Sequence, residues 1–246
     1  MDLHNSHEKS NRALEKSHLS ALSLDSPLLT LQRNNKGILS KQYIENAVVI
    51  FTDLTGFQNL SEQYGDTMCI SIIEALFSQF DAIATRLDLM PLKTNGDQYI
   101  VVSLCDGSHL ENGTISRSVS KAVNFSINAR NLVSTNTLLV SSQCYLRVGI
   151  ATGPVLAGFS SRLCSSFDIW GSTVNRAAML EQFTAPNTIA ICKNSFQHVR
   201  YERLRTNECT VENAETSGSP LNNMHCQTFH STEIKTKAKF IKAYIC

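Results

Sequence analysis

The chain has 246 residues, of which 42% are hydrophobic, and its 22 Lys and Arg residues nearly balance 21 Asp and Glu residues, for a formal net charge of +1. This composition excludes a wholly disordered chain and allows one large domain or two small ones. The near-neutral charge argues against a nucleic-acid-binding protein or a polybasic membrane surface. No run approaches the roughly 20 apolar residues that span a bilayer, and the N-terminus lacks an apolar signal segment, so we expect a cytoplasmic protein without a membrane span. Eight cysteines without a CxxC pair favour buried thiols over a zinc site or a disulfide framework.

Residues 1–45 are rich in Ser, Asn, Lys and His, so we expect a flexible N-terminal extension there and one folded domain over residues 46–246. The domain opens with the apolar run 47–51, which predicts a buried strand that stops at Asp53 and turns at Gly56. A helix should follow, because apolar residues recur at three- and four-residue spacing, at Ile70, Ile73, Phe77, Phe80, Ala84 and Leu87.

Strands over 89–94 and 98–104 flank Asn95 and Gly96, and this dipeptide predicts a type I′ hairpin turn with Asp97 directly after it. The rest of the chain predicts, in order, a polar loop over 106–118, a second amphipathic helix, a hairpin of strands 145–151 and 155–159, a helix over 172–182, a strand over 188–192, a polar loop over 207–223 and a basic strand over 235–245. The order β-α-β-β-α-β predicts an α/β (α+β) fold, a ferredoxin-like sandwich with C-terminal additions.

Two carboxylates end neighbouring elements of this expected sheet. Asp53 and Asp97 would meet at one edge if the first strand pairs beside the hairpin, and two carboxylates there suit Mg²⁺ or Mn²⁺. The alternative is structural, with Asp53 as a helix cap and Asp97 as a turn residue. Thr55, Gly56 and Phe57 open a strand-to-helix turn whose free N–H groups could hold phosphate oxygens. The chain has no GxxxxGK[ST] segment, which removes the main support for a P-loop NTPase.

Four segments, in order, resemble the catalytic domain of class III nucleotidyl cyclases. They are VVIFTDLTGF (48–57), KTNGDQYIV (93–101), LRVGIATGPVLAG (146–158) and FDIWGSTVNRAAMLE (167–181). The resemblance implies a ferredoxin-like fold of the cyclase type. It also implies an active site at a dimer interface, where the ribose 3′-hydroxyl of a nucleoside triphosphate attacks its own α-phosphorus and expels pyrophosphate. Asp53 and Asp97, with the backbone carbonyl of Leu54, would hold two Mg²⁺ or Mn²⁺ ions per site.

Base choice resembles the adenylyl type. Lys93 and Asp168 stand where adenylyl cyclases carry Lys and Asp and guanylyl cyclases carry Glu and Cys, and Ile169 and Trp170 complete the base-reading segment. Adenine offers an N6 amino donor to a carboxylate and an N1 acceptor to an ammonium, whereas guanine presents the reverse pattern. The resemblance therefore implies ATP as substrate and 3′,5′-cyclic AMP as product. The structural alternative is a solvated lysine and a surface acid.

One position departs from the family pattern. Asn175 stands where the family carries a ribose-orienting Asn, but Met179, one helical turn later, replaces the Arg that stabilises the transition state. Arg176 projects about 60° past the required face of the helix. Lys237, or with less support Lys235, corresponds to the family's late phosphate-binding lysine, although a basic edge strand also discourages aggregation.

The Met179 substitution leaves three functions open. The first is an adenylate cyclase of low activity, acting as a homodimer. The second is a weak or inactive homologue that binds nucleotide or pairs with a complete cyclase chain in a heterodimer. The third is a cyclase for another base, against which Lys93 and Asp168 argue.

Overall fold

A computed structural model describes residues 41–105, 113–160, 166–200, 229–235 and 240–246. The elements in chain order are β1 (Gln42–Thr55), α3 (Phe57–Tyr64), α4 (Asp66–Arg86), β2 (Met90–Asn95), β3 (Gln98–Cys105), α5 (Thr114–Thr135), α6 (Thr137–Ser141), β4 (Tyr145–Phe159), β5 (Phe167–Trp170), α7 (Ser172–Phe183), β6 (Thr188–Cys192), β7 (His230–Lys235) and β8 (Phe240–Ile245). Residues 193–200 are also helical. The expected N-terminal extension and the expected loop over 207–223 lie outside the described residues, apart from the start of β1.

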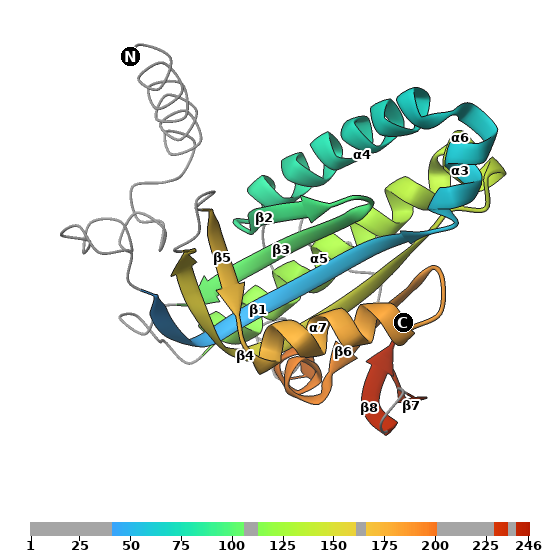
Figure 1. The fold of residues 1–246 in the computed structure, drawn as a ribbon. Helices are drawn as coiled ribbons and strands as arrows, with labels where there is room; N and C mark the ends of the chain where they lie inside the picture. The colour runs from blue at the N-terminus through green and yellow to red at the C-terminus, as the bar shows by residue number, and fades with distance from the viewer. Residues whose placement is uncertain (1–40, 106–112, 161–165, 201–228, 236–239) are drawn as a thin grey trace, which may run out of the picture.

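The strands form one mixed sheet in the order β2-β3-β1-β4-β6-β8-β7, and β5 pairs with β4 beside this path (Figure 1). The first four strands, with α4 and α5 as their connections, have the order of a ferredoxin-like β-α-β-β-α-β unit. The expected fold class is therefore confirmed. β6 runs parallel to β4, and β8 and β7 extend the sheet as the C-terminal additions.

The central strand β1 is buried on both faces, which explains its continuous apolar run. Val48 and Ile50 face a core shared with α4 and α5, whereas Val49 and Phe51 face a second core shared with α7. Figure 1 shows α4 and α5 on one side of the sheet and α7 on the other. The sheet thus separates two apolar layers. The end of β1 after Phe51 is the part of the strand that carries Asp53, a candidate site residue.

The first long helix, α4, differs from the expected pattern at its start. Ile70 is 57% exposed, and the buried stripe is Cys69, Ile72, Ile73, Leu76, Phe80, Ile83 and Ala84. The first turn of α4 has apolar residues on two faces, so the sequence does not determine which face is buried. Packing against the sheet buries the face with Cys69. Among the described residues, α4 is the one helix whose length and composition would allow it to span a membrane. Its stripe lies against the sheet, as in the core helix of a globular domain.

The turn between β2 and β3 is shifted by one residue from the expected turn. Asn95 pairs with Gln98, so Gly96 and Asp97 are the two turn residues. Gly96 has a positive φ of 63°, and neither Asn95 nor Asp97 does. A positive φ at the first central residue alone fits a type II′ turn, so the expected type I′ turn centred on Asn95 and Gly96 is wrong. Asp97 consequently lies within the turn.

The expected hairpin at residues 145–159 is also wrong. β4 is one continuous strand of 15 residues that passes through Gly153 and Pro154. It pairs with β1 along its length, and the register shifts between Ile44 and Ala47 opposite this dipeptide. The irregular pairing there accommodates a proline, which has no N–H to donate to the ladder. The sequence alone reads the same dipeptide as a turn.

Two further boundaries differ from expectation. The loop expected over 106–118 ends by Thr114, where α5 begins, and its first part lies outside the described residues. The single basic strand expected over 235–245 is instead two antiparallel strands, β7 and β8. Residues 236–239 between them, including Lys237, lie outside the described residues.

Candidate active site

Asp53 near the end of β1 is paired with an arginine from the neighbouring strand. Arg147 on β4 is the register partner of Asp53, and its Nη2 lies 2.5 Å from Asp53 Oδ2. The two side chains are 22% and 18% exposed, so water screens this ion pair less than a surface pair. The sequence analysis missed Arg147. The one signal for it in the sequence is that Arg147 is the single charged residue of β4.

A third charged group, Glu181 on α7, joins this pair. Its Oε1 lies 2.9 Å from Arg147 Nη2, and its Oε2 accepts a 3.4 Å hydrogen bond from Gln98 Nε2. Only 5% of its side chain is exposed. Burial, and then the negative charge of Asp53, raise the pKa of Glu181 to about 7, although Arg147 opposes the rise. The sequence analysis missed this residue as well.

Glycines on β4 bring α7 close enough to place Glu181 there. A Cβ at Gly149 would lie 2.2 Å from the carbonyl oxygen of Ala177 and 2.3 Å from the backbone nitrogen of Glu181. A Cβ at Gly153 would lie 2.7 Å from Thr173 Oγ1. The helix therefore rests on β4 through the face that carries residues 173, 177 and 181. The absence of side chains at these two glycines fixes the position of the helix.

Asp97 lies at the same end of the sheet as Asp53. Burial raises the pKa of Asp97, and the negative charge of Asp53 raises it further, whereas Arg147 lowers it. The structure thus brings together the two carboxylates that the sequence analysis singled out. Their oxygens are ligands that Mg²⁺ and Mn²⁺ prefer. Within the described ranges, no three His, Cys, Asp or Glu side chains form a ready ligand set, so the Leu54 carbonyl, phosphate oxygens and water would have to complete the coordination.

The turn after β1 depends on a glycine at position 56. Gly56 has a φ of 77°, and a Cβ there would lie 2.6 Å from the backbone oxygen of Gln143. Thr55 Oγ1 donates to the backbone oxygen of Tyr145 at 3.1 Å, and Phe57 begins α3. The free N–H groups in the first turn of α3 therefore come only a few residues after Asp53 in the chain.

Lys93 and Asp168, far apart in sequence, meet in the structure. Lys93 Nζ on β2 lies 2.6 Å from Asp168 Oδ2 on β5. Their side chains are 46% and 21% exposed, so this donor and acceptor stand side by side where solvent can enter. Ile169 is buried and could offer only its backbone to a ligand. The Trp170 ring lies beneath Lys41 Nζ, 4.7 Å from the ring centroid.

The outer face of α7 carries the remaining expected residues. Asn175 and Arg176 are exposed, and Met179 is half-buried. Asn175 and Met179 are one turn apart and lie on the face opposite residues 173 and 177, which rest on the sheet. Within the described residues, the side chain of Asn175 therefore stays exposed to solvent.

The comparison with known families supports the resemblance drawn from the motifs. The family described as "Adenylate and Guanylate cyclase catalytic domain" matches residues 39–230. The chain belongs to this cyclase family. The match covers the described sheet and helices up to β7.

Individual relatives include both adenylate and guanylate cyclases. The chain is 25% identical over 170 residues to an adenylate cyclase of Mycobacterium tuberculosis, covering 69% of this chain and 37% of that protein. It is also 25% identical over 174 residues to the guanylate cyclase soluble subunit beta-2 of Rattus norvegicus, covering 68% and 24%. The chain thus matches about a third or less of the length of these curated relatives.

A solved structure supports the fold. The catalytic core of a rhodopsin-guanylyl cyclase with converted specificity, in complex with ATPαS, superposes with a TM-score of 0.63 at 22% identity. The superposition covers 85% of this chain and 98% of that one. This cyclase fold accounts for the ferredoxin-like unit and its C-terminal strands.

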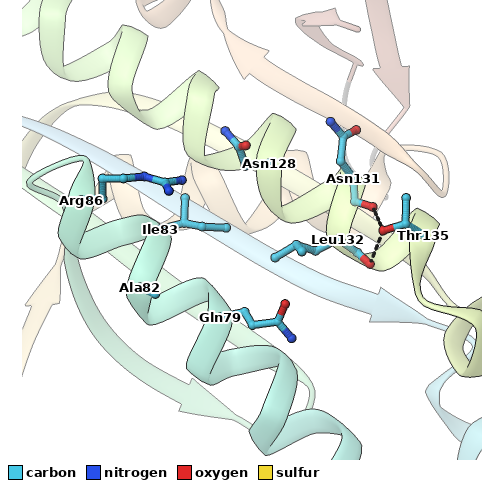
Figure 2. A pocket seen from close by; sticks show the side chains of 8 residues that line it. All are labelled: Gln79, Ala82, Ile83, Arg86, Asn128, Asn131, Leu132 and Thr135. Atoms are coloured by element: carbon cyan, nitrogen blue, oxygen red, sulfur yellow. Dashed lines mark hydrogen bonds between the residues drawn. The ribbon is translucent and has the colours of Figure 1, made fainter. Parts of the chain in front are cut away.

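A groove of about 400 Å³ lies elsewhere, between the two helices that cover the other face of the cyclase sheet (Figure 2). It is lined by Gln79, Ala82, Ile83 and Arg86 of α4 and by Asn128, Asn131, Leu132 and Thr135 of α5. None of the expected site residues lines it.

Proposed function

We propose that this cyclase converts ATP into 3′,5′-cyclic AMP and pyrophosphate. The observation that carries the adenylate specificity is the 2.6 Å contact between Lys93 Nζ and Asp168 Oδ2. An ammonium and a carboxylate side by side match the N1 acceptor and the N6 amino donor of adenine. Guanine would place its O6 acceptor against the carboxylate and its N1–H donor against the ammonium, and neither pair can form a hydrogen bond.

The carboxylates of Asp53 and Asp97 would hold two Mg²⁺ or Mn²⁺ ions, with the Leu54 carbonyl as a further ligand. When bound, such cations lower the pKa of the attacking 3′-hydroxyl and neutralise charge on the leaving oxygens. The N–H groups at Gly56 and Phe57 would orient phosphate oxygens.

A second chain would complete the site. Asn175 is exposed on α7, so it is free to orient the ribose of a nucleotide held by the carboxylates of another protomer. The partner can be a second copy of this chain or another cyclase chain. Lys237 remains a candidate for phosphate binding from the C-terminal strands. The cytoplasmic location also stays a prediction.

Met179 favours a second candidate function, a weak or inactive homologue that works through a complete partner chain. The half-buried thioether of Met179 cannot donate to a developing phosphate charge. In a heterodimer, the partner would supply the missing arginine and this chain would supply Asp53 and Asp97. Such a chain would be silent alone and active when mixed.

Product analysis tests the proposal. The purified chain is incubated with Mn²⁺ and ATP, and separately with GTP, CTP and UTP, and the products are separated by chromatography. The proposal expects cyclic AMP from ATP and little product from the other nucleotides. A cyclic product mainly from GTP or a pyrimidine nucleotide would contradict the adenylate specificity.

A further inference from the structure

The guanidinium of Arg147 is shared between two carboxylates, and one oxygen of Glu181 is left without a hydrogen bond. Its Nη2 lies 2.5 Å from Asp53 Oδ2 and 2.9 Å from Glu181 Oε1, and its Nη1 donates to the backbone oxygen of Gln182 at 3.2 Å. The Nε of Arg147 is buried and has no hydrogen-bond partner. Glu181 Oε1 is also buried and makes no hydrogen bond of good geometry despite its short distance to Nη2. Two unsatisfied buried atoms on facing side chains are costly, which points to a second arrangement of this pair.

We propose that Arg147 is an internal counter-cation that a divalent metal must displace from Asp53, and that Glu181 is the positioning residue that receives the displaced guanidinium. The inference rests on the proposed function, because it takes Asp53 as a metal ligand. It adds that Arg147 and the metal compete for the carboxylate of Asp53, and that Glu181 sets the outcome of this competition.

The competition follows from charge and geometry. Oδ2 of Asp53 is taken by Nη2 in the present arrangement, and a divalent cation bound to the same carboxylate would repel the guanidinium. The displaced Arg147 can turn Nε and Nη2 together toward Glu181. A two-bond fork of this kind would satisfy both buried atoms that now lack partners.

The surrounding backbone keeps Arg147 next to Glu181 during this change. Nη1 is held by the carbonyl of Gln182, in the last turn of α7, where the helix dipole favours a cation. The close approach of α7 to Gly149 prevents the helix from following the guanidinium toward Asp53. The Arg147 side chain therefore needs only to turn while its Nη1 stays bound to the Gln182 carbonyl.

The test is the affinity for Mn²⁺ without nucleotide, measured at pH 7 by the loss of the electron paramagnetic resonance signal of free Mn²⁺. Arg147→Met removes the competitor and should tighten Mn²⁺ binding about tenfold. Glu181→Gln removes the alternative partner, holds Arg147 on Asp53 and should weaken binding by about threefold or more. Glu181→Asp, which keeps the carboxylate, should restore part of this loss.

A double variant separates this role from a general electrostatic effect of Glu181. Without Arg147 there is no guanidinium for Glu181 to receive, so Glu181 loses its indirect influence on Asp53. Glu181→Gln should then change Mn²⁺ affinity little in the Arg147→Met background. An equal loss in both backgrounds would overturn the proposal, since it would mean that Glu181 acts directly on the metal.

Controls address folding and the proposed function. Asp88→Asn breaks the ion pair with Lys121. Asp88 lies before the start of β2, whereas Asp97 lies beyond the other end of that strand, so Mn²⁺ affinity should stay unchanged. Arg147→Gln repeats the test if Arg147→Met does not fold cooperatively. Wild-type binding that is lost in Asp53→Asn but unchanged in both Arg147 variants would overturn the inference alone. If neither the wild type nor an Arg147 variant binds Mn²⁺, the metal site and the inference both fail.

Discussion

Exchanging the two base-reading charges should convert the nucleotide preference without unfolding the protein. The change is Lys93→Glu together with Asp168→Cys. The ion pair that it removes has side chains 46% and 21% exposed, and exposed pairs contribute at most about 1 kcal/mol to stability. We therefore expect a change in the free energy of unfolding within about 1 kcal/mol.

The effect on selectivity should be much larger than the effect on stability. In the complex, each of the two groups would face a mismatched donor or acceptor away from bulk water, and each mismatch costs about 1–3 kcal/mol. Two mismatches give about 2–6 kcal/mol, which corresponds to a change of about 30-fold to 10⁴-fold in the ratio of kcat/KM for ATP to that for GTP.

The assay is kcat/KM for each nucleotide with Mn²⁺, using the wild type, the double variant and a matched control. The control applies the same substitutions to another ion pair, Lys121→Glu with Asp88→Cys, whose Nζ and Oδ2 atoms are 2.9 Å apart. The control should keep the wild-type ratio. A ratio unchanged within threefold in a folded Lys93→Glu, Asp168→Cys variant would mean that these residues do not read the base.

The remaining predictions concern the carboxylates and the outer face of α7. Asp53→Asn and Asp97→Asn should each lower Mn²⁺-dependent turnover by about 10²-fold or more while thermal unfolding stays cooperative; loss of cooperative unfolding in both would mark them as structural. Met179→Arg should raise the initial rate about tenfold, and no rise, with activity only after mixing with a complete cyclase chain, would favour the heterodimer. The raised pKa of Glu181, about 7 against 4.5 unfolded, makes the folded state bind more protons between these values, so stability should fall by up to about 3 kcal/mol as pH rises through this window. Urea unfolding at pH 5 and pH 7.5 should show a smaller fall for Glu181→Gln, and an equal fall would assign the dependence to other groups.

Local patterns in the sequence were sufficient for much of the fold. The strand predicted over 188–192 is β6, and the helix predicted over 172–182 differs from α7 by one residue. In both, the apolar pattern and the flanking residues agree with the tertiary packing. The turn at Gly96 and the continuous β4 could not be predicted, because each depends on pairing with a strand distant in the sequence.

The candidate site also combines residues that local motifs predict with residues that only the tertiary structure brings in. Asp53, Asp97, Lys93 and Asp168 could be predicted as site residues because each stands within a motif, and the structure brings Asp53 toward Asp97 and Lys93 onto Asp168. Arg147 was missed, because its partner Asp53 is 94 residues away and becomes its neighbour only through the register of β1 and β4. Glu181 was missed for a similar reason, since the glycines of β4 determine where α7 rests.

A competition experiment tests the central claim most directly. The wild-type chain is incubated with Mn²⁺ and equal concentrations of ATP, GTP, CTP and UTP, and all cyclic nucleotides are quantified by mass spectrometry beside Asp53→Asn. The account predicts 3′,5′-cyclic AMP as the dominant product, at a low rate, and its loss in the variant. Another cyclic nucleotide in excess, or cyclic AMP that persists in Asp53→Asn, would contradict it.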